Sequence, residues 1–353
     1  MSGEGTAPRF FDGHCDTALW IADEGVDFVG GDASVQVDWP RLQSAGVRAQ
    51  VFACFVLSER YPGAEAQRAE TLLSALDEVF EPTDGGIRAA RSASDLRASF
   101  DEGGPISAVF ALEGADPLCG KAENLRAYSE RGVRSLIFAW KDNPFSGSAF
   151  GRNGPLTGEG RRLLGLCEEL RVLVDVSHAS DAAFEEICQA VTRPFIASHS
   201  NCRALSPSPR NLTDEMIRAV ADRGGVMGIN LAPAFLSPES YVAWKRIRRQ
   251  LLAEGLPWRE AERRARQIAS TVPRPAFGWI VRHVLHAIDV GGEDVVGLGG
   301  DLDGIVQMPD GIDGVEGYPR IAEALHVAGL SEVQVEKVCF RNLLRAFEDV
   351  LGD

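Results

Sequence analysis

Eight apolar segments of strand length, with helical patterns between them, constrain the fold more than any other feature of the sequence. They are residues 10–16, 47–57, 107–114, 133–140, 172–178, 194–200, 225–231 and 295–301. Near-continuous apolar strands separated by amphipathic helices are typical of a parallel sheet that is buried on both faces. Eight such units predict an α/β fold of the (β/α)8 TIM-barrel type, and a chain of 353 residues fits one such barrel with insertions.

The segments between the strands support this prediction. Residues 66–80, 161–170 and 182–191 carry apolar side chains at helical spacing. The longest departure from the repeat is residues 232–278, between strands seven and eight, which is rich in arginine. Charged helical segments are commonly solvated, but insertions after barrel strands lie over the mouth of the active site. We therefore expect one catalytic domain, residues 1–353, with a helical insertion that is either a solvated helix pair or a lid.

Ionisable side chains gather at the carboxyl ends of the predicted strands. The set comprises His14, Asp16, Glu113, His178, His199 and Asp301. Active sites of such barrels are built at that end, from side chains of several strands. His14 and Asp16 are two residues apart in a strand and therefore point to the same side. An imidazole and a carboxylate that converge in this way are suitable ligands for a divalent cation such as zinc.

Each of these residues also has a purely structural interpretation. A lone His178 or His199 is more often a buried, hydrogen-bonded histidine than a ligand, but two histidines that end adjacent strands are hard to place in a core. Glu113 ends an apolar strand, where a carboxylate must be paired or metal-bound to offset its desolvation. Asp301 lies in a glycine-rich segment, where Asp303 competes with it for a role in the site.

Composition argues against several functions. The net charge of -15 disfavours a nucleic-acid or anionic-membrane partner, because phosphate binding requires a concentrated basic face. No stretch of the sequence reaches the roughly 18 apolar residues that a membrane span needs, and the first ten residues lack an apolar signal core. Seven widely spaced cysteines form no C-x-x-C pair and are expected to be reduced. We therefore expect a cytoplasmic protein.

Five groups of motifs make the sequence resemble the renal (membrane) dipeptidase family of the amidohydrolase superfamily. They are residues 12–16 (DGHCD), 112–114 (LEG), 175–178 (DVSH), 198–201 (SHSN) followed by 210–212 (RNL), and 300–304 (GDLDG). They occur in the family's order across almost the whole chain. The resemblance implies a binuclear zinc dipeptidase in which His14 and Asp16 hold one zinc ion, His178 and His199 hold the other, and Glu113 bridges the two.

The resemblance also implies roles beyond the metal ligands. Arg210 is the expected clamp for the terminal carboxylate of a dipeptide, a role that suits the bidentate guanidinium fork. Asp301 is expected to accept the proton of the attacking water and to pass it to the leaving amine. Family members usually carry a histidine after the fourth strand, where this chain has Ala139 or Trp140, and Asn143 is a candidate substitute in substrate binding. Tolerance of a D-residue at the C-terminal position and a homodimer are further expectations from the family.

Two alternative functions stay open at this point. Other amidohydrolases use a carboxylated lysine at the end of strand four and act on cyclic amides, lactones or phosphoesters, and Lys141 lies close to that place. Glu113 is the better bridge, since it ends an apolar strand whereas Lys141 follows Trp140 at a predicted loop. Alternatively, the missing histidine marks a zinc-binding protein that has lost catalysis, although Asp301 and Arg210 would be unnecessary in such a protein.

Overall fold

Parallel strands form the core of the computed structural model, which describes residues 8–254, 258–269 and 272–353. The strands are β1 (Phe10–Cys15), β2 (Val47–Phe55), β3 (Ile87–Ala89), β4 (Ile106–Glu113), β5 (Val133–Ile137), β6 (Leu173–Asp175), β7 (Ile196–Ala197), β8 (Val226–Ile229) and β9 (Val296–Leu298). The sheet order is β2-β1-β9-β8-β7-β6-β5-β4-β3, and a further pairing of β2 with β4 closes the barrel. All eight predicted strands are present, so the predicted (β/α)8 barrel is confirmed.

The ninth strand, β3, is not predicted by the sequence pattern. Ile87–Ala89 pairs with the first residues of β4, from Ile106 to Ala108, while β5 pairs with the later part of β4. Only Ile87 of this strand is fully buried, and Arg88 is exposed. The strand therefore exists through backbone pairing at one end of β4 and leaves no apolar run for a sequence pattern to detect.

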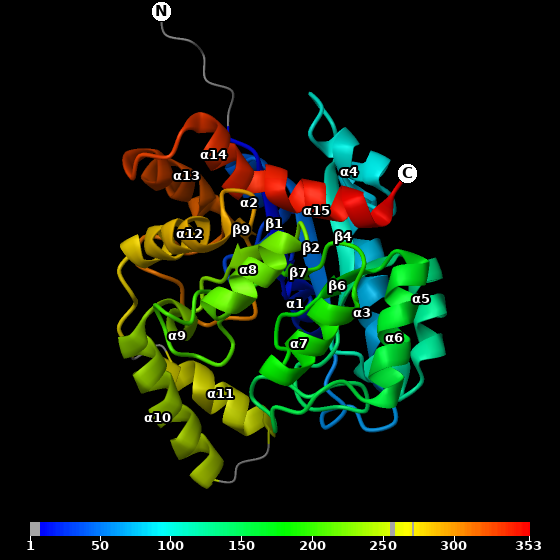
Figure 1. Cartoon of the computed structure of the whole chain (residues 1–353). Helices are drawn as coiled ribbons and strands as arrows, with labels where there is room; N and C mark the ends of the chain where they lie inside the picture. Colours follow the sequence, from blue (N-terminus) through cyan, green and yellow to red (C-terminus); the bar gives the residue numbers. More distant parts are fainter. Residues whose placement is uncertain (1–7, 255–257, 270–271) are drawn as a thin grey trace, which may run out of the picture.

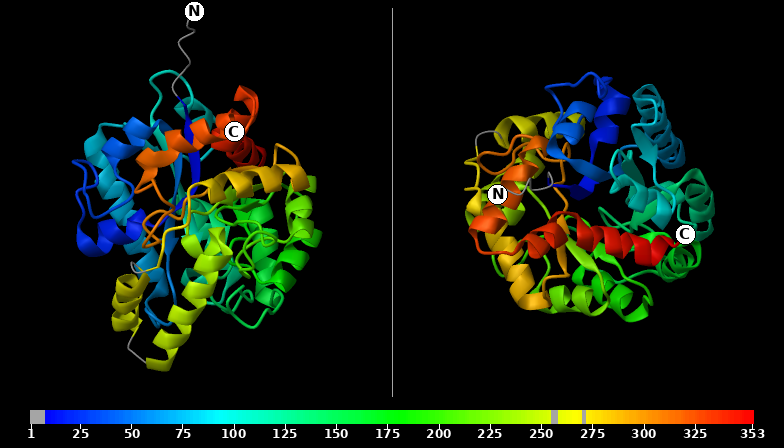
Figure 2. Two further views of the ribbon diagram at one scale, coloured as in Figure 1. Left: turned by 90° about the vertical axis from the view of Figure 1, so that its left-hand side faces the viewer. Right: turned by 90° about the horizontal axis from the view of Figure 1, so that it is seen from above.

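Most of the helices form a ring around the barrel, as Figure 1 and both views of Figure 2 show. The helices of the described chain are α1 (Thr17–Glu24), α2 (Trp39–Ala45), α3 (Glu65–Phe80), α4 (Ala93–Ser99), α5 (Leu125–Arg131), α6 (Gly158–Leu170), α7 (Asp181–Ala190), α8 (Asp214–Asp222), α9 (Pro233–Leu236), α10 (Pro238–Glu254), α11 (Trp258–Ala269), α12 (Gly278–Gly291), α13 (Tyr318–Val327), α14 (Glu332–Glu336) and α15 (Asn342–Leu351). The helices predicted within 66–80, 161–170 and 182–191 correspond to α3, α6 and α7. The side chains of Thr157 and Ser180 accept hydrogen bonds from the first turns of α6 and α7, which fixes where these helices begin.

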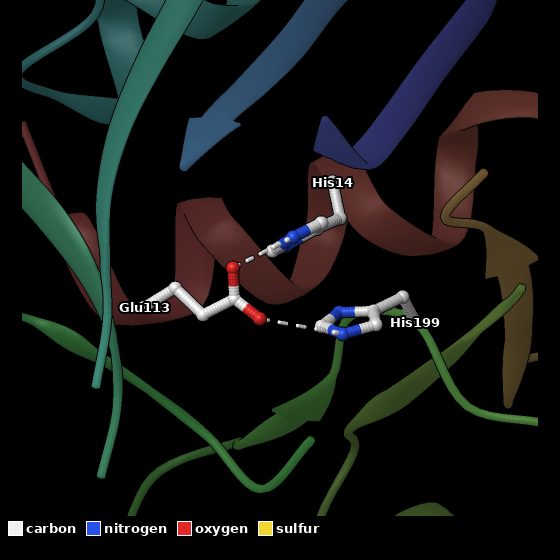
Figure 3. A group of neighbouring side chains, drawn as sticks. All are labelled: His14, Glu113 and His199. Atoms are coloured by element: carbon white, nitrogen blue, oxygen red, sulfur yellow. Dashed lines mark ion pairs between the residues drawn. The ribbon is translucent and has the colours of Figure 1, made fainter. Parts of the chain in front are cut away.

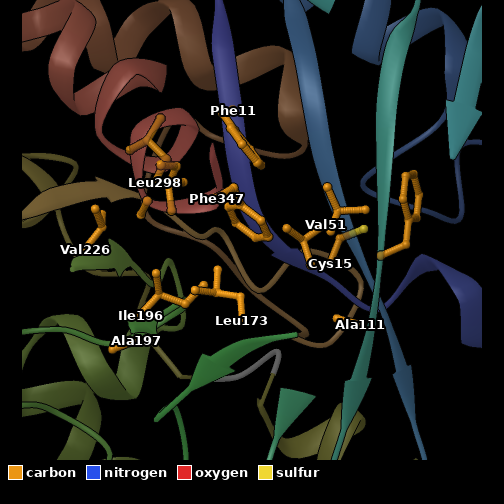
Figure 4. Packing of buried hydrophobic residues seen from close by; sticks show 14 of the residues in the cluster. Phe11, Cys15, Val51, Ala111, Leu173, Ile196, Ala197, Val226, Leu298 and Phe347 are labelled. Atoms are coloured by element: carbon orange, nitrogen blue, oxygen red, sulfur yellow. The ribbon is translucent and has the colours of Figure 1, made fainter. Parts of the chain in front are cut away.

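The amino-terminal end of the barrel is closed by apolar packing. The ring of Phe347 from α15 stacks on Phe11 of β1, with ring centroids 5.2 Å apart. Figure 4 shows both rings in the same apolar cluster as Leu298 of β9 and Val226 of β8. Because side chains fill this end, the opposite end, where the strands finish, is left for a functional site.

The insertion predicted at 232–278 contains α9, α10 and α11 and leads into α12. Residues 255–257 and 270–271 of this insertion, and residues 1–7 of the predicted domain, lie outside the described residues. In Figure 1, α10 and α11 extend beyond the ends toward which the barrel strands point, on the side opposite α15. Within the described part of the chain, no helix is both long and apolar enough to cross a lipid bilayer.

Candidate metal centre

Four strands bring the five predicted metal ligands to one place. His14 lies in β1 and Asp16 directly follows it, Glu113 is the last residue of β4, and His178 and His199 follow β6 and β7. The Nε2 atom of His14 lies 3.4 Å from Glu113 Oε2 and 3.6 Å from Asp16 Oδ2. Figure 3 shows the Glu113 carboxylate between the imidazoles of His14 and His199. The structure therefore brings these candidate ligands close to one another.

The other two imidazoles, of His178 and His199, complete the cluster on the other side of the carboxylate. His178 Nε2 lies 3.1 Å from Glu113 Oε1, and His199 Nε2 lies 4.0 Å from the same oxygen. The Nε2 atoms of His178 and His199 are 3.0 Å apart, and the His14 and His199 rings have centroids 3.9 Å apart. All five candidate ligand residues are at most 6% exposed. Glu113 thus presents one oxygen to each half of the cluster.

The chemistry of this cluster fits a metal centre. His14 Nε2 is buried and has no hydrogen-bond partner in the described structure. A buried imidazole nitrogen of this kind is costly unless a further group binds it. Three imidazole nitrogens and two carboxylates form the nitrogen and oxygen donor set that zinc prefers. His14, Glu113 and His199, and separately His14, Asp16 and Asp301, offer ligand atoms within 4.8 Å of one another.

Hydrogen bonds behind the cluster orient His199. Asp175 Oδ1 accepts the backbone N–H groups of Ser177 (2.9 Å) and Ser198 (3.0 Å), and Ser177 Oγ accepts the N–H of His199 (3.1 Å). Ser198 Oγ lies 2.8 Å from His199 Nδ1. With Nδ1 engaged, Nε2 is the His199 nitrogen that faces the cluster, an arrangement common for metal-binding histidines. The serines before both histidines therefore have a supporting role.

The backbone is left-handed at three residues of these loops. His178 has a φ of 67°, Asp301 of 59° and Asp303 of 66°. Such angles are uncommon for residues other than glycine and persist where the surroundings enforce them. At Gly304, an added Cβ would lie 2.1 Å from Asp16 Oδ2 and 2.7 Å from Asp301 Oδ1, so only glycine fits beside these carboxylates. Local strain thus accompanies the close approach of the acidic groups.

The competition between Asp301 and Asp303 is resolved by their contacts. Asp303 Oδ2 accepts the hydroxyl hydrogen of Thr17 at 2.6 Å, and its Oδ1 accepts the N–H of Gln36. The Asp301 carboxylate instead lies with His14 in the metal-ligand cluster. The left-handed turn sends the two carboxylates in different directions, which leaves Asp301 in the site and Asp303 in a supporting position.

Burial and neighbouring charges set the protonation states. Burial lowers the pKa of His178 to about 3, and it also lowers the pKa of His199 well below its usual value. Burial raises the pKa of Glu113, but His14 and His178 outweigh this effect and hold that pKa below its usual range. Burial and the nearby Glu113 charge raise the pKa of Asp16 to about 7. The histidines His178 and His199 are therefore neutral at pH 7, which is the state that binds metal.

His14 lies between the carboxylates and responds differently. Burial lowers the pKa of His14, but the negative charges of Glu113 and Asp16 raise it by more than burial lowers it. The pKa of His14 therefore lies well above its usual value. For Asp301, burial raises the pKa to about 6, and the nearby Glu113 charge contributes to this rise. The acidic groups therefore attract positive charge to this point, which is the condition for binding a divalent cation.

Arg210, in the loop after β7, is a buried cation beside the cluster. Its side chain donates hydrogen bonds to Ser200 Oγ (3.2 Å) and to the carbonyl oxygen of His199 (3.0 Å), and Nε has no partner. Burial lowers its pKa to about 10, so it stays charged at pH 7. Among the described residues, no carboxylate lies within ion-pair distance of it. A buried guanidinium without an anionic partner is costly, so Arg210 is suited to bind an anionic group.

Asn143 is not placed with the other predicted site residues. Its Nδ2 donates to the carbonyl oxygen of Phe138 (2.8 Å) and to Asp116 Oδ2 (3.1 Å). Its Oδ1 accepts the backbone N–H groups of Phe145 and Ser146. Because the whole amide is engaged, by the backbone of its own segment and by Asp116 after β4, these contacts oppose the substrate-binding role that the sequence indicated, and the residue instead holds the loop after β5.

Lys141 and Trp140 also follow β5, and each has contacts of its own. Lys141 is about half exposed and its Nζ pairs with Glu59 Oε1 at 2.6 Å, away from the metal ligands. The Trp140 ring lies 5.8 Å from the His178 ring and 5.3 Å from the Phe55 ring, centroid to centroid. An apolar wall of the site therefore occupies the place where the family's additional histidine is expected.

One residue of the site is missing from the sequence prediction. Asn230 directly follows β8, and its Nδ2 donates a hydrogen bond to Asp301 Oδ2 at 2.9 Å. The signal that identifies the metal ligands, a polar side chain just after an apolar strand, is also present at this position. Asn230 was not predicted because asparagine is not ionisable, and the sequence prediction used only ionisable side chains at the ends of strands.

Comparisons with known proteins agree with this geometry. The family model "Membrane dipeptidase (Peptidase family M19)" matches residues 6–351. An uncharacterised protein from the pqqA 5′ region of Klebsiella pneumoniae is 34% identical over 286 residues, which cover 79% of this chain and 94% of that protein.

Solved structures show the same fold. The crystal structure of the dipeptidase AC, a metallopeptidase of family M19, superposes with a TM-score of 0.83 at 26% identity, covering 98% of this chain and 100% of that one. A metallopeptidase from Rhodobacter sphaeroides, liganded with a phosphinate mimic of the dipeptide L-Ala-D-Ala, gives a TM-score of 0.81 at 24% identity, covering 98% and 99%. The chain therefore belongs to the membrane dipeptidase family, peptidase family M19, and is a metallopeptidase that hydrolyses peptide bonds.

Proposed function

We propose that this protein is a dipeptidase that works with two zinc ions. In this proposal His14 and Asp16 would hold one ion, His178 and His199 would hold the other, and Glu113 would be shared between them. The observation that carries the proposal is the orientation of the Glu113 carboxylate, because Oε2 lies 3.4 Å from His14 Nε2 and Oε1 lies 3.1 Å from His178 Nε2. A carboxylate that offers one oxygen to each half of a cluster is suited to join two cations.

The remaining residues supply binding and proton transfer. When bound, the zinc ions would polarise the scissile carbonyl and lower the pKa of a water molecule. Arg210 would hold the terminal carboxylate of the dipeptide and so fix the peptide bond over the cluster. Asp301 would accept a proton from the attacking water and give it to the leaving amine. Its pKa of about 6 suits both steps near neutral pH.

We also propose that a D-residue is accepted at the C-terminal position of the substrate. Arg210 would bind the carboxylate, a group that residues of both hands share, so this contact does not select chirality. The Rhodobacter sphaeroides metallopeptidase that shares the fold is liganded with a mimic of L-Ala-D-Ala, which supports the same proposal. Side-chain selection would then depend on the apolar wall around Trp140.

We propose that α10 and α11 form a lid over this end of the barrel. Arg248 of α10 lies over the rings of Phe150 (4.9 Å) and Trp244 (5.4 Å). Phe150, in the loop after β5, lies 6.5 Å from Phe235, and Phe235 lies 5.5 Å from the guanidinium of Arg210. These contacts connect α10 with the expected carboxylate clamp. On the other side, α11 reaches α1 through a cation–π contact of 5.0 Å.

A kinetic screen tests the proposed function. Zinc-loaded protein is offered dipeptides that vary at both positions and in chirality, and we expect hydrolysis of L,L and L,D dipeptides. Bound zinc without hydrolysis of any dipeptide would favour a zinc-binding protein that has lost catalysis, the alternative suggested by Ala139 and Trp140 in place of a histidine. Retention of a buried Arg210 beside the cluster argues against that alternative.

The cellular location and assembly are proposed on narrower grounds. All seven cysteines are free, which supports a cytoplasmic location because thiols stay reduced there. A homodimer stays a prediction from the family resemblance.

A further inference from the structure

Asn230 is fully buried, and its side-chain amide can adopt only one orientation. Nδ2 donates to Asp301 Oδ2 (2.9 Å) and to the carbonyl oxygen of His199 (3.3 Å), while Oδ1 accepts the N–H of Ala232 (2.6 Å). Exchanging the two amide atoms would set an acceptor against two acceptors and a donor against a donor. The hydrogen bonds therefore identify Nδ2 as the atom that faces Asp301.

The backbone of Asn230 is held as firmly as its side chain. Asn201 Oδ1 accepts the N–H of Asn230 (3.0 Å), and Asn201 Nδ2 donates to the carbonyl oxygen of Asn230 (2.9 Å). Since β7 has only two residues, the Asn201 side chain continues its pairing with β8 in place of a backbone. At Gly228 the two segments are so close that an added Cβ would lie 1.9 Å from Ser198 O. Asn230 is thus fixed by the barrel itself.

We propose that Asn230 is a positioning residue that commits the Asp301 carboxylate to a single proton-accepting oxygen, an assignment that rests on the proposed dipeptidase function. Because Oδ2 of Asp301 accepts from Asn230, Oδ1 is the oxygen left for the reaction. It takes one proton from the attacking water as the C–O bond forms. It returns that proton to the leaving nitrogen as the C–N bond breaks, so the carboxylate is regenerated.

The same contact limits rotation of the carboxylate. The backbone of Asp301 is held by a hydrogen bond from its N–H to the carbonyl oxygen of His14 (3.2 Å), which fixes the start of the side chain. The Asn230 amide fixes its end. General acid–base catalysis contributes about 10²- to 10⁴-fold to a rate, and loss of alignment should remove part of it. We therefore expect Asn230→Ala to lower kcat roughly 10- to 100-fold, with KM changed by less than about threefold.

A double-mutant cycle tests this assignment. Asn230→Ala, Asp301→Ala and the double variant are compared with the wild-type protein for kcat, KM, bound zinc and thermal unfolding. If Asn230 acts through Asp301, its substitution lowers kcat in the wild-type background and has no further effect in the Asp301→Ala background. Equal fold-losses in both backgrounds would overturn the assignment, as would a loss of kcat that only follows a loss of bound zinc.

Two further variants separate positioning from packing. Asn230→Asp keeps the size of the side chain but removes the donor, so it should lower kcat at least as much as alanine, and it replaces the alanine variant if that protein does not fold. Asn342 is the matched control, because it is also buried and its Nδ2 donates to the carbonyl oxygens of Glu293 and Val296 (both 2.9 Å), away from the ligand cluster. Asn342→Ala should lower stability without changing kcat.

The outcomes distinguish this assignment from the proposed function. Hydrolysis by the wild-type protein, with unchanged kcat in the folded Asn230→Asp variant, would overturn only the role of Asn230. Failure of the zinc-loaded wild-type protein to hydrolyse any dipeptide would overturn the proposed function, and the role of Asn230 with it.

Discussion

Replacing Glu113 by glutamine tests whether one carboxylate joins the two halves of the cluster. Glu113 is 4% exposed, and its oxygens face His14 and His178 from opposite sides of the carboxylate. Glutamine has nearly the same shape but carries no charge and offers only one acceptor oxygen. The variant can therefore present an oxygen to one half of the cluster only, and we expect both zinc ions to bind more weakly.

The size of this effect follows from binding linkage. Zinc that binds only the folded state stabilises it by about 4 kcal/mol when its free concentration is about 1,000 times the Kd. If the substitution weakens binding about 100-fold, the same concentration contributes about 1.4 kcal/mol. Unfolding entropy is about 2.1 cal/mol/K per residue, or about 0.74 kcal/mol/K for 353 residues. The zinc-dependent rise in Tm should therefore fall from about 5.5 °C to about 2 °C.

The assay is thermal unfolding of metal-free protein with increasing zinc. Lys141→Met is the matched control, because Lys141 pairs with Glu59 at the surface and should not affect the zinc-dependent shift in Tm. An equal shift in Glu113→Gln and wild-type protein would refute the bridging role of Glu113. A shift lost in Lys141→Met instead would favour a carboxylated lysine.

Three further substitutions test other parts of the account. Arg210→Lys keeps the positive charge but loses the two-pronged guanidinium group. KM for dipeptides should therefore rise about 10-fold or more with bound zinc unchanged. An unchanged KM in steady-state kinetics would contradict the proposed binding of the substrate carboxylate by Arg210. Phe150→Ala removes a ring that α10 contacts through Arg248. Backbone hydrogen exchange in α10 should therefore become faster, and kcat/KM should fall. Unchanged hydrogen exchange in α10 would contradict the proposed lid. His283 is buried and its Nδ1 accepts the N–H of Cys202, and burial lowers its pKa to about 4 from an unfolded value of about 6.5. Between these two pKa values the unfolded state binds more protons than the folded state. The free energy of unfolding of wild-type protein, relative to that of His283→Gln, should therefore fall by about 3 kcal/mol as the pH is lowered from about 6.5 to 4. Urea unfolding measures this difference, and a difference that does not change with pH would contradict this reasoning.

The cluster of candidate metal ligands could be anticipated from the sequence because two independent signals agree. Residue type indicates metal chemistry, and position at the end of an apolar strand indicates the open end of a barrel. Glu113, His178 and His199 satisfy both conditions, and parallel strands in one closed sheet necessarily bring such positions together. Strand β3 could not be predicted in this way, because its residues pair through the backbone at one end of β4 and only one of them is fully buried.

Loop conformation explains the predictions that the sequence could not decide. Asp301 and Asp303 are of the same type and two residues apart, and only their left-handed backbone angles send one carboxylate to the site and the other to Thr17. Asn143 has a suitable amide, but the residues around the turn after β5 and Asp116 after β4 already occupy its hydrogen-bonding groups. Asn230 is the reverse case, since its role depends on a contact with a residue 71 positions away in the chain.

Zinc anomalous diffraction from crystals of the zinc-loaded protein tests the central claim most directly. Two anomalous peaks should appear at the carboxyl end of the barrel, one contacted by His14 and Asp16, one by His178 and His199, and both by Glu113. A single peak, peaks elsewhere, or a Glu113 side chain that contacts neither would contradict the binuclear site on which the proposed mechanism depends.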